Sequence, residues 1–470
     1  MLEIQGCLQD DTIAAISTPV GEGGIGIIRL SGKESYRIVL EVFRPSRLTD
    51  EEGYPVNRKM YHGNISNPEG EVIDEVLVCF MKAPHTYTRE DIVELNSHGG
   101  RVVLKTVLDT VLQKGARLAQ PGEFTKRAFI NGRIDLGQAE SVLHVVQARS
   151  EKALKIAARN VGGELSREIN EIKDQLFQAR VELEVTFDFP EDDVQETGNK
   201  ELEEGLDSIY QRVKRFCEGA RKGVYLQEGL RLSIVGKTNV GKSSLLNYLL
   251  HQKRAIVTEV PGTTRDTLEE NIFLGGIPVK LIDTAGIRKT EDPVEEIGVR
   301  RAREALESAD MILMLLDGTT GIKQEDVDIM EELQGKKNGD VMVAVNKTDY
   351  GEEINAESVQ KYLPGKPVFF ISVLQEKGVE EIENYLYRWV EKESSLEEEN
   401  ALVVSRRHEE SLALAEESIR NAVFLCRNRE PVDLVSFELY QAEKKLGEII
   451  GEEVTEDLLD SIFNEFCIGK

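Results

Sequence analysis

A glycine-rich segment near the middle of the sequence limits the possible folds more strongly than any other feature. The letters GKTNVGKS occupy residues 236–243, directly after the apolar run RLSIV and directly before the helix-like run SLLNYLL. This is the G-x-x-x-x-G-K-S pattern of a phosphate-binding loop between a strand and a helix. Its glycines let backbone N–H groups turn toward phosphates, while Lys242 supplies a positive charge and Ser243 a hydroxyl ligand for Mg²⁺. Residues 224–385 alternate apolar strands with amphipathic segments, which predicts a doubly wound α/β domain around the loop.

Three further motifs follow in the order expected of a GTP-binding domain. GTTRD, which begins at Gly262, offers Thr264 as a second hydroxyl for Mg²⁺, and DTAG at 283–286 places Asp283 near the metal. In NKTD, Asp349 can accept the ring and exocyclic N–H groups of guanine, a pair of donors that adenine lacks. The sequence therefore predicts GTP as the nucleotide. The predicted GTP-binding residues are Asn239, Val240, Gly241, Lys242, Ser243, Ser244, Thr258, Glu259, Val260, Pro261, Gly262, Thr263, Thr264, Asp283, Thr284, Ala285, Gly286, Asn346, Lys347, Asp349, Ser372, Val373 and Leu374.

Two positions depart from the usual pattern of such domains. Ser372-Val373-Leu374 stands where a last base-contacting loop would carry Ser-Ala, and we expect the change to be tolerated because that contact uses a backbone N–H. Ile287 follows the DTAG motif, where many small GTPases have a glutamine that orients the attacking water. An aliphatic side chain cannot orient water, so hydrolysis must take charge and a water-positioning group from elsewhere.

The composition regimes predict four segments and a multidomain α/β fold class. An N-terminal α/β domain (1–120) precedes a helical part (121–223), the P-loop GTPase domain (224–385) is inserted next, and a second helical part (386–470) completes the helical domain. The acidic stretch that begins at Phe187 contains Pro190 and is expected to be a loop. One face of a long helix is predicted to pack in a core, because its apolar residues recur at steps of three and four; these are Leu165, Ile169, Ile172, Leu176, Ala179 and Leu183.

Composition bounds the location and the partners of the chain. Its 470 residues carry 58 Lys and Arg against 85 Asp and Glu, a formal net charge of −27. That charge, taken alone, disfavours nucleic acid and anionic membranes as partners. There is no apolar run long enough to span a membrane, no basic region at the N-terminus and no C-x-x-C pair among the five cysteines. We therefore expect a cytoplasmic protein with no membrane association.

Together these features resemble the MnmE (TrmE) family of tRNA modification GTPases. The resemblance rests on a GTPase domain inserted in a helical domain, Asn239 within the P-loop, GTTRD, the aliphatic residue after DTAG, and CIGK at 467–470. It extends to the N-terminal region in DTIAAISTPVGEGGIGIIRLSG, REDIVELNSHGG and PGEFTKRAFINGRIDLGQAE. The resemblance implies a GTP hydrolase that works with a flavin-dependent partner, MnmG (GidA). The pair would install a carboxymethylaminomethyl or aminomethyl group at C5 of the wobble uridine of certain tRNAs.

The same resemblance implies a potassium-dependent hydrolysis in which K⁺ takes the part of an arginine finger. Carried onto matching positions, it places Asn239 and the switch residues Thr258, Val260 and Thr263 around K⁺. A monovalent cation there neutralises the charge that develops between the β- and γ-phosphates. The resemblance also makes Glu295 the catalytic residue that orients water, in place of the missing glutamine.

The N-terminal domain of the family resembles folate-binding one-carbon enzymes and implies a site for 5-formyltetrahydrofolate across a homodimer. The matching positions are Arg29, Glu94 and Arg133, with Lys470 near the same region. A glutamate suits the donors on the pterin ring, and arginines suit the carboxylate tail of folate. The family often has lysine where Arg133 stands, so the charge is kept while the contact geometry changes.

Two residues have open alternatives. Cys467 either acts as a nucleophile toward the uridine, activated by a nearby cation, or packs at the end of the last helix. His98, between a polar strand end and a Gly-Gly turn, is either a proton shuttle or, as we favour, a structural residue.

Alternatives also remain for the activity and for the way in which RNA is bound. The GTPase domain alone fits a ribosome-assembly switch without modification chemistry equally well, whereas a membrane-remodelling GTPase would need a basic amphipathic helix. If tRNA is the substrate, either local basic segments hold it or a more basic partner does. Those segments are Lys126-Arg127, 212–215, 300–303 and Arg406-Arg407.

Overall fold

The computed structural model describes most of the chain, in two compact units. The described residues are 11–19, 21, 23–46, 55–148, 150–188, 195–253, 270–274, 277–282, 309–334, 340–351, 353–393, 402 and 405–470. The first unit comprises Met1–Gln147, Ala157–Val213 and Ser411–Lys470, and the second comprises Ala148–Ile156 and Lys214–Glu410. In line with the predicted fold class, a mixed sheet and helices form the first unit and a mostly parallel sheet forms the second.

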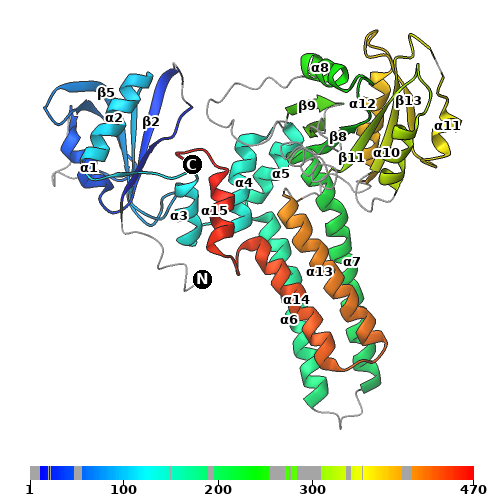
Figure 1. Ribbon diagram of the computed structural model, residues 1–470. Helices are drawn as coiled ribbons and strands as arrows, with labels where there is room; N and C mark the ends of the chain where they lie inside the picture. Colours follow the sequence, from blue (N-terminus) through cyan, green and yellow to red (C-terminus); the bar gives the residue numbers. More distant parts are fainter. Residues whose placement is uncertain are drawn as a thin grey trace, which may run out of the picture. The chain divides into compact units, whose positions relative to one another are not determined.

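The first unit contains a seven-stranded sheet in the order β3-β4-β5-β6-β2-β1-β7. Neighbouring strands are antiparallel except β1 and β7. Helices α1 (Ser35–Val42) and α2 (Arg101–Gln113) pack on one face, where they meet alternate residues of the strands such as Ile28 and Leu30 (Figure 1). The intervening residues therefore lie on the opposite face. The strands are β1 (Ile13–Ile16), β2 (Gly23–Ser31), β3 (Phe43–Pro45), β4 (Met60–Ser66), β5 (Val72–Met81), β6 (Ile92–Gly99) and β7 (Arg117–Leu118).

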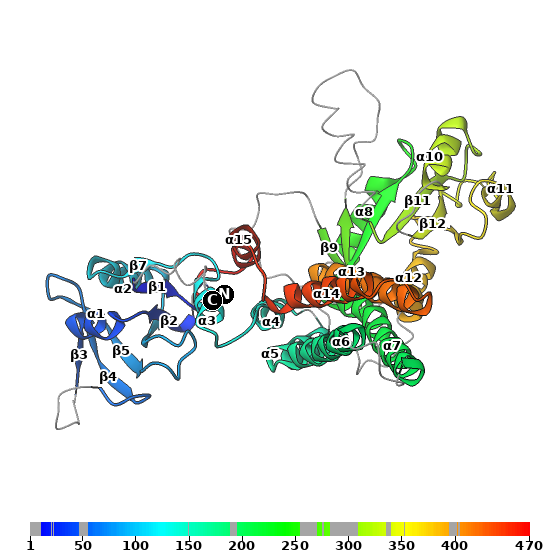
Figure 2. The ribbon, with the colours of Figure 1, turned by 90° about the horizontal axis from the view of Figure 1, so that it is seen from below.

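Helices make up the rest of the first unit, and the long ones lie side by side as a bundle (Figures 1 and 2). All six residues of the predicted apolar stripe lie in α6 and are at most 7% exposed, which confirms the stripe as core. The helices that lie wholly or, for α5, α7 and α13, partly in this unit are α3 (Glu123–Ile130), α4 (Leu136–Gln147), α5 (Glu151–Val161), α6 (Glu164–Asp188), α7 (Gln195–Gln227), α13 (Arg406–Arg427), α14 (Val432–Ile450) and α15 (Glu456–Asn464).

The acidic stretch after Phe187 is largely helical, so the prediction of a loop there was wrong over most of its length. Helix α6 continues to Asp188, and α7 begins at Gln195. Pro190 can end a helix, but the residues that follow are mainly Glu, Lys, Leu and Gln, which have high helix propensity. Their charge does not by itself prevent a helix.

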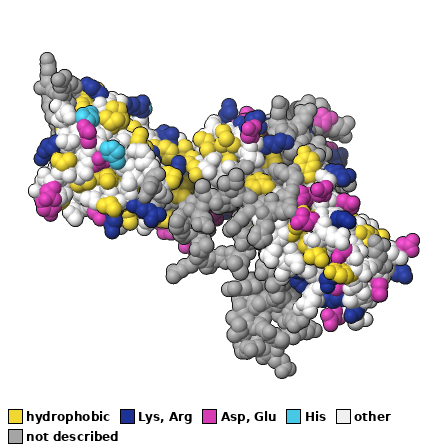
Figure 3. All heavy atoms as spheres, turned by 90° about the horizontal axis from the view of Figure 1, so that it is seen from above, with side chains coloured by type: hydrophobic (Ala, Val, Ile, Leu, Met, Phe, Trp, Pro, Cys, Tyr) yellow, Lys and Arg dark blue, Asp and Glu magenta, His cyan; other side chains and the backbone are white. Residues whose placement is uncertain are grey.

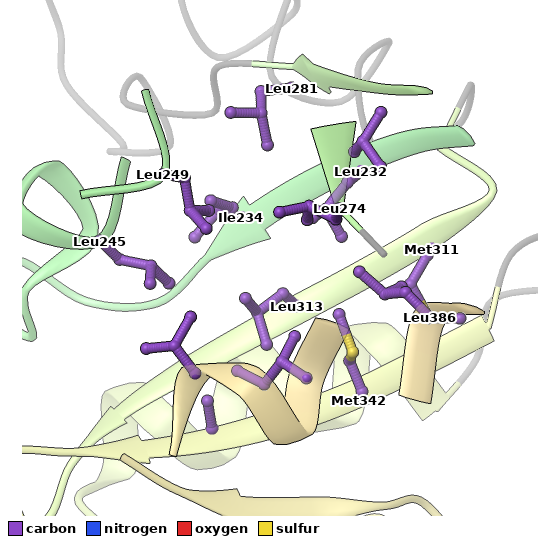
Figure 4. Close-up of a cluster of buried hydrophobic side chains, with 14 of the residues drawn as sticks. Leu232, Ile234, Leu245, Leu249, Leu274, Leu281, Met311, Leu313, Met342 and Leu386 are labelled. Atoms are coloured by element: carbon purple, nitrogen blue, oxygen red, sulfur yellow. The ribbon is translucent and has the colours of Figure 1, made fainter. Parts of the chain in front are cut away.

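The second unit is built on a six-stranded sheet in the order β13-β12-β11-β8-β10-β9, parallel except for β9. Helices α8 (Lys242–Lys253) and α12 (Val379–Glu393) pack on one face, where Leu245, Leu313 and Leu386 meet in the core (Figure 4). Helix α10 (Gln324–Gln334) packs on the other face, and α11 (Ala356–Gln360) lies between β12 and β13 in the chain. The strands are β8 (Leu230–Val235), β9 (Glu270–Leu274), β10 (Ile277–Ile282), β11 (Met311–Asp317), β12 (Asp340–Asn346) and β13 (Val368–Phe370). The doubly wound architecture predicted from the sequence is thus present, with β9 as an edge strand that was not predicted.

A search of the described residues for membrane-spanning segments gives a negative result. None of their helices combines the length and the apolar character that crossing a bilayer requires.

Candidate functional site

The loop between β8 and α8 has the backbone of a phosphate-binding loop. Gly236 and Gly241 have φ values of 145° and 103°, a region that favours glycine, and Asn239 between them has φ of 65°. A Cβ atom on Gly241 would collide with the side-chain amide of Asn346. Nζ of Lys242 donates to the main-chain oxygens of Gly236, at 2.5 Å, and of Lys237, at 2.7 Å. The ammonium group is therefore folded back over the loop, which is the part of the motif that cradles phosphates.

Two side chains of the NKTD motif, at the end of β12, donate hydrogen bonds to main-chain oxygens of the P-loop. Nδ2 of Asn346 donates to the main-chain oxygen of Val240 at 2.9 Å, and Nζ of Lys347 donates to that of Asn239 at 2.7 Å. Nζ of Lys347 also lies 2.6 Å from Oδ2 of Asp317 at the end of β11. Burial raises the pKa of Asp317, but its hydrogen bonds with Lys347 and with Thr319 outweigh burial and lower it. Asp317 therefore stays ionised as the counter-charge of Lys347.

Asp349 and the segment after β13 come together at the same edge of the sheet. Oδ1 of Asp349 accepts a hydrogen bond from Oγ of Ser372 at 2.7 Å, and the backbone N–H of Val373 donates to Oδ1 of Asn346 at 3.2 Å. The side chain of Val373 is buried in the core, whereas Leu374 is exposed. The larger residue at 373 thus fits without removing a backbone contact. Ser243 and Ser244 lie in the first turn of α8.

The remaining predicted residues of the GTP and metal sites lie outside the described residues, so their roles stay predictions. Of the four predicted K⁺ ligands, Asn239 falls within the described part of the chain. The residues outside it are Thr258, Glu259, Val260, Pro261, Gly262, Thr263, Thr264, Asp283, Thr284, Ala285, Gly286, Ile287 and Glu295.

In the first unit, Arg29 and Glu94 form a pair on the sheet face opposite α1 and α2. They stand directly opposite each other on β2 and β6, and Nη2 of Arg29 lies 2.8 Å from Oε1 of Glu94. Both side chains are about one quarter exposed, at 24% and 25%. Cys79 pairs with Glu94 from β5, and burial, together with the charge of Glu94, raises the pKa of the Cys79 thiol. A neutral thiol therefore borders the ion pair.

Two aromatic rings flank this pair. The guanidinium carbon of Arg29 lies 6.0 Å from the ring centroid of Tyr87 and 5.8 Å from that of Phe124 in α3. Arg133 covers the Tyr87 ring at 4.6 Å, and its Nη1 donates to the main-chain oxygen of Tyr87 at 3.2 Å. Arg133 is exposed, so its charge faces solvent beside the rings. The structure thus brings Arg29, Glu94 and Arg133 around one aromatic surface.

The end of the chain reaches the same place. The main-chain oxygen of Lys470 accepts a hydrogen bond from the N–H of Phe124 at 3.1 Å, and that of Gly469 accepts one from Oγ of Ser17 at 3.1 Å. Gly469 has φ of 96°, and a Cβ there would collide with the main-chain oxygen of Ile16. Lys470 therefore joins the cluster through its backbone.

The two residues with open alternatives are both exposed. Phe466 packs in the core at the end of α15, whereas Cys467 is exposed, so the packing alternative for Cys467 was wrong. Nδ1 of His98 lies 2.7 Å from Oδ1 of Asp74, and the His98 side chain is 70% exposed. That hydrogen bond, and then the charge of Asp74, raises the pKa of His98. His98 and Asp74 form an exposed ion pair between β6 and β5.

The chain is similar to known proteins over nearly its whole length. The family model of the MnmE helical domain matches residues 136–467, and that of the GTP-binding protein TrmE N-terminus matches residues 12–133. The tRNA modification GTPase MnmE of Clostridioides difficile (strain 630) is 44% identical over 461 residues, which cover 98% of this chain and 99% of that protein. The chain belongs to the MnmE family of tRNA modification GTPases. The MnmE of Alkaliphilus metalliredigens (strain QYMF) is 45% identical with the same coverage.

Among solved structures, Era of Aquifex aeolicus bound to GDP and AlF4⁻ is similar to part of this MnmE-family chain. It is 27% identical and covers 40% of this chain and 66% of its own, with a TM-score of 0.28. That score is too low to add to the family assignment.

Two arginines of the basic segments considered for RNA binding are paired with carboxylates within the fold of this MnmE-family protein. Arg127 is 1% exposed and is enclosed by Asp11, Glu90 and Glu123. Arg406 forms a bidentate pair with Asp310. Because each guanidinium already has carboxylate partners and is largely buried, neither is available to a phosphate backbone. On the face drawn in Figure 3, acidic and basic side chains are interspersed over the described surface.

The other predicted basic segments give a mixed picture. Arg212 pairs with Glu168 and Glu171 on α6, and Lys126 pairs with Asp460. Residues 300–303 lie outside the described part of the chain. Among the described residues of the 212–215 segment, Lys214 and Arg215 are exposed.

Sequence reasoning missed Asp317, Tyr87 and Phe124. Asp317 ends an apolar strand, as Asn346 does, and that shared position was a usable signal. The two aromatic residues had no such signal, because one lies in a loop and the other in α3, and the fold brings them together.

Proposed function

We propose that this chain is a potassium-dependent GTP hydrolase that modifies C5 of the wobble uridine of certain tRNAs together with the flavoprotein MnmG (GidA). A tetrahydrofolate derivative supplies the one-carbon unit. Family membership carries the GTPase and the tRNA parts of this proposal. The joint presence of Arg29, Glu94, Arg133 and the Tyr87 ring on one face of the sheet carries the folate part.

The folate part follows from the chemistry of the cluster. The carboxylate of Glu94 matches the N–H donors of a pterin ring, and the Tyr87 ring, which is half-buried against the buried Phe124, offers flat apolar surface for that ring. Arg133, exposed at the rim, suits the carboxylate tail of folate. The homodimer proposed for this family would complete the site from a second copy.

A titration of the purified chain with 5-formyltetrahydrofolate tests this site. Glu94→Gln keeps the size of the side chain but replaces one acceptor oxygen with a donor, and we expect it to weaken binding by at least about tenfold, the equivalent of one charge-assisted hydrogen bond. Arg37→Met is the matched control, because Arg37 forms exposed pairs with Glu34 and Glu41 in the same domain. Equal binding by wild type and Glu94→Gln would overturn the assignment.

The potassium part rests on the position of Asn239 in the P-loop and on Ile287 after DTAG. The main-chain oxygen of Asn239 accepts a hydrogen bond from Lys347, which fixes the backbone at this position. Asn239 has the positive φ of the left-handed region. K⁺ beside it would supply the positive charge that an arginine finger supplies in other GTPases. Mg²⁺ would be held by Ser243 and Thr264.

The rate of GTP hydrolysis in KCl and in NaCl at equal ionic strength tests this part. We expect the rate of hydrolysis to be at least about tenfold higher in K⁺, because the ion neutralises charge that develops in the transition state. Glu295→Ala should keep GTP binding and lose turnover. Equal rates in the two salts would remove K⁺ from the mechanism, and full turnover in Glu295→Ala would remove Glu295.

The names of the full-length relatives favour modification chemistry over a ribosome-assembly switch. Analysis of tRNA nucleosides from a deletion strain separates the two. Loss of the modified wobble uridine, restored by the wild-type gene, supports the proposal. A normal tRNA nucleoside profile in the deletion strain supports the switch instead.

A further inference from the structure

A buried ion pair joins the P-loop to α10, a helix that carries none of the motifs described above. Nζ of Lys237, the second residue of the loop, lies 2.8 Å from Oδ2 of Asp326. The side chains are 12% and 1% exposed. Oδ2 of Asp326 also accepts the backbone N–H of Lys323 at 3.0 Å, while among the described residues Oδ1 has no hydrogen-bond partner. Lys237 is therefore the charge that compensates a buried carboxylate.

The pair completes a set of anchors that hold the P-loop on both faces of the sheet. Val240 is fully buried in the core beneath α8 and α12, and Asn346 and Lys347 hold the second half of the loop through its main-chain oxygens. The first half, Gly236 and Lys237, has its side-chain anchor on the opposite face, where α10 packs. Nζ of Lys242 is bonded to the main-chain oxygens of these same two residues.

We propose that Asp326 is a positioning residue for nucleotide binding, because it fixes the first half of the P-loop through Lys237. Helix α10 is held to the sheet by Met330 and Leu333, which are buried in the core. Asp326 lies one to two turns before them on the same helix, so its carboxylate has a fixed position against which Lys237 is held. The backbone N–H groups that must face the phosphates are thereby aligned before nucleotide arrives. The proposal rests on nucleotide binding by this P-loop.

Removal of the negative charge of Asp326 should displace Lys237 and the first half of the P-loop. In Asp326→Asn, the ammonium group of Lys237 is left without a counter-charge and lies in the same loop as the ammonium group of Lys242. A largely buried cation without a partner moves toward solvent, and its backbone moves with it. The carbonyl groups of Gly236 and Lys237 then shift, and the phosphate cradle shifts with them.

Titration with N-methylanthraniloyl-GDP tests the proposal in the full chain. We expect Asp326→Asn to weaken binding by about tenfold and to raise KM for GTP, while kcat at saturating GTP stays within about threefold. Lys237→Arg keeps the ion pair and should bind within about threefold of wild type. Asp328→Asn on the same helix is the matched control, because Asp328 is exposed and accepts a hydrogen bond from Gln324, so the nucleotide affinity of this variant should equal that of wild type.

The double variant Lys237→Met with Asp326→Leu separates positioning from folding. Replacing a buried ion pair with apolar residues removes the uncompensated charge, so the melting temperature should recover. The anchor is still lost, so binding should stay weak. Recovery of affinity along with the melting temperature, or wild-type affinity in Asp326→Asn, overturns the proposal. Failure of wild type itself to bind the probe would instead count against nucleotide binding.

Discussion

Arg127 shows how a single residue can connect segments that are distant in sequence. Its Nη2 lies 2.6 Å from Oδ1 of Asp11 and 3.0 Å from Oε1 of Glu123, and its Nη1 lies 3.2 Å from Glu90. Arg117 shares two of these carboxylates, at 2.6 Å from Oδ2 of Asp11 and from Oε1 of Glu123. The network therefore ties the segment before β1 and the loop before β6 to α3, the helix that carries Phe124.

We expect Arg127→Met to destabilise the N-terminal domain by about 1–3 kcal/mol, because Glu90 loses its pair with Arg127 while Arg117 still pairs with Asp11 and Glu123. Hydrogen exchange of the β1 and α3 amides measures the free energy of opening. Lys126→Met is the control, since Lys126 pairs with an exposed Asp460 and should change that free energy by less than about 1 kcal/mol. Equal protection in the two variants would show that the network contributes nothing to stability.

The same network predicts a loss of stability in acid. Burial raises the pKa of Asp11 and of Glu123, but hydrogen bonds from Arg117 and, in addition, from Arg127 outweigh it and lower both below their ordinary values of 3.8 and 4.5. A lowered pKa in the folded state stabilises the fold above the ordinary value, and that contribution is lost as the pH falls through the lowered one. Opening of β1 should thus become easier below about pH 4.5, the ordinary value of Glu123, and the pH dependence should be smaller in Arg127→Met. A pH dependence unchanged in the variant would contradict this account.

At the scale of elements, neighbouring residues of α6 differ sharply in exposure, because one lies on the core face of the helix and the next on its outer face. Leu176 is fully buried in the apolar stripe, and Phe177 is 57% exposed on the same turn. We expect Leu176→Ala to cost about 2–5 kcal/mol, because it leaves a cavity in a packed core. Phe177→Ala should cost less than about 1 kcal/mol, since it removes a largely exposed ring. Urea denaturation followed by far-UV circular dichroism compares them, and a larger loss in Phe177→Ala would mean that the exposed face is covered in solution.

Elements whose apolar residues recur with a clear period could be predicted from the sequence. A strand that exists because it pairs with another strand could not. The stripe of α6 and the five apolar strands of the GTPase domain follow from their own residues. Strand β9 exists because it pairs with β10, and the N-terminal part of α7 exists although its charge favoured a loop. The same distinction holds in the sites. Gly236 and Lys242 follow from a local motif, whereas the partnership of Lys237 with Asp326 joins residues 89 positions apart, and no local pattern indicates it.

At the scale of the whole molecule, the net charge of −27 now has a structural counterpart. Arg127, Arg212 and Arg406 of the predicted basic segments are paired with carboxylates, and Arg127 is also buried. Charges used in this way stabilise the fold and release few counterions when RNA binds. Among the described residues of those segments, Lys214 and Arg215 on α7 are exposed. We therefore expect a more basic partner to hold most of the tRNA.

This view predicts weak tRNA binding by the chain alone, with a shallow dependence on salt. Each phosphate contact contributes about −0.9 to the slope of log Kobs against log salt, so we expect a slope no steeper than about −2. Fluorescence anisotropy of labelled tRNA between about 50 and 200 mM KCl, the range in which phosphate contacts dominate, measures it. If Lys214 contacts a phosphate, Lys214→Ala should make the slope shallower by about one unit. A slope of about −6 or steeper would require several free cations on this chain. The acidic composition would then conceal a local basic surface, and the chain would be the main RNA-binding component of the complex.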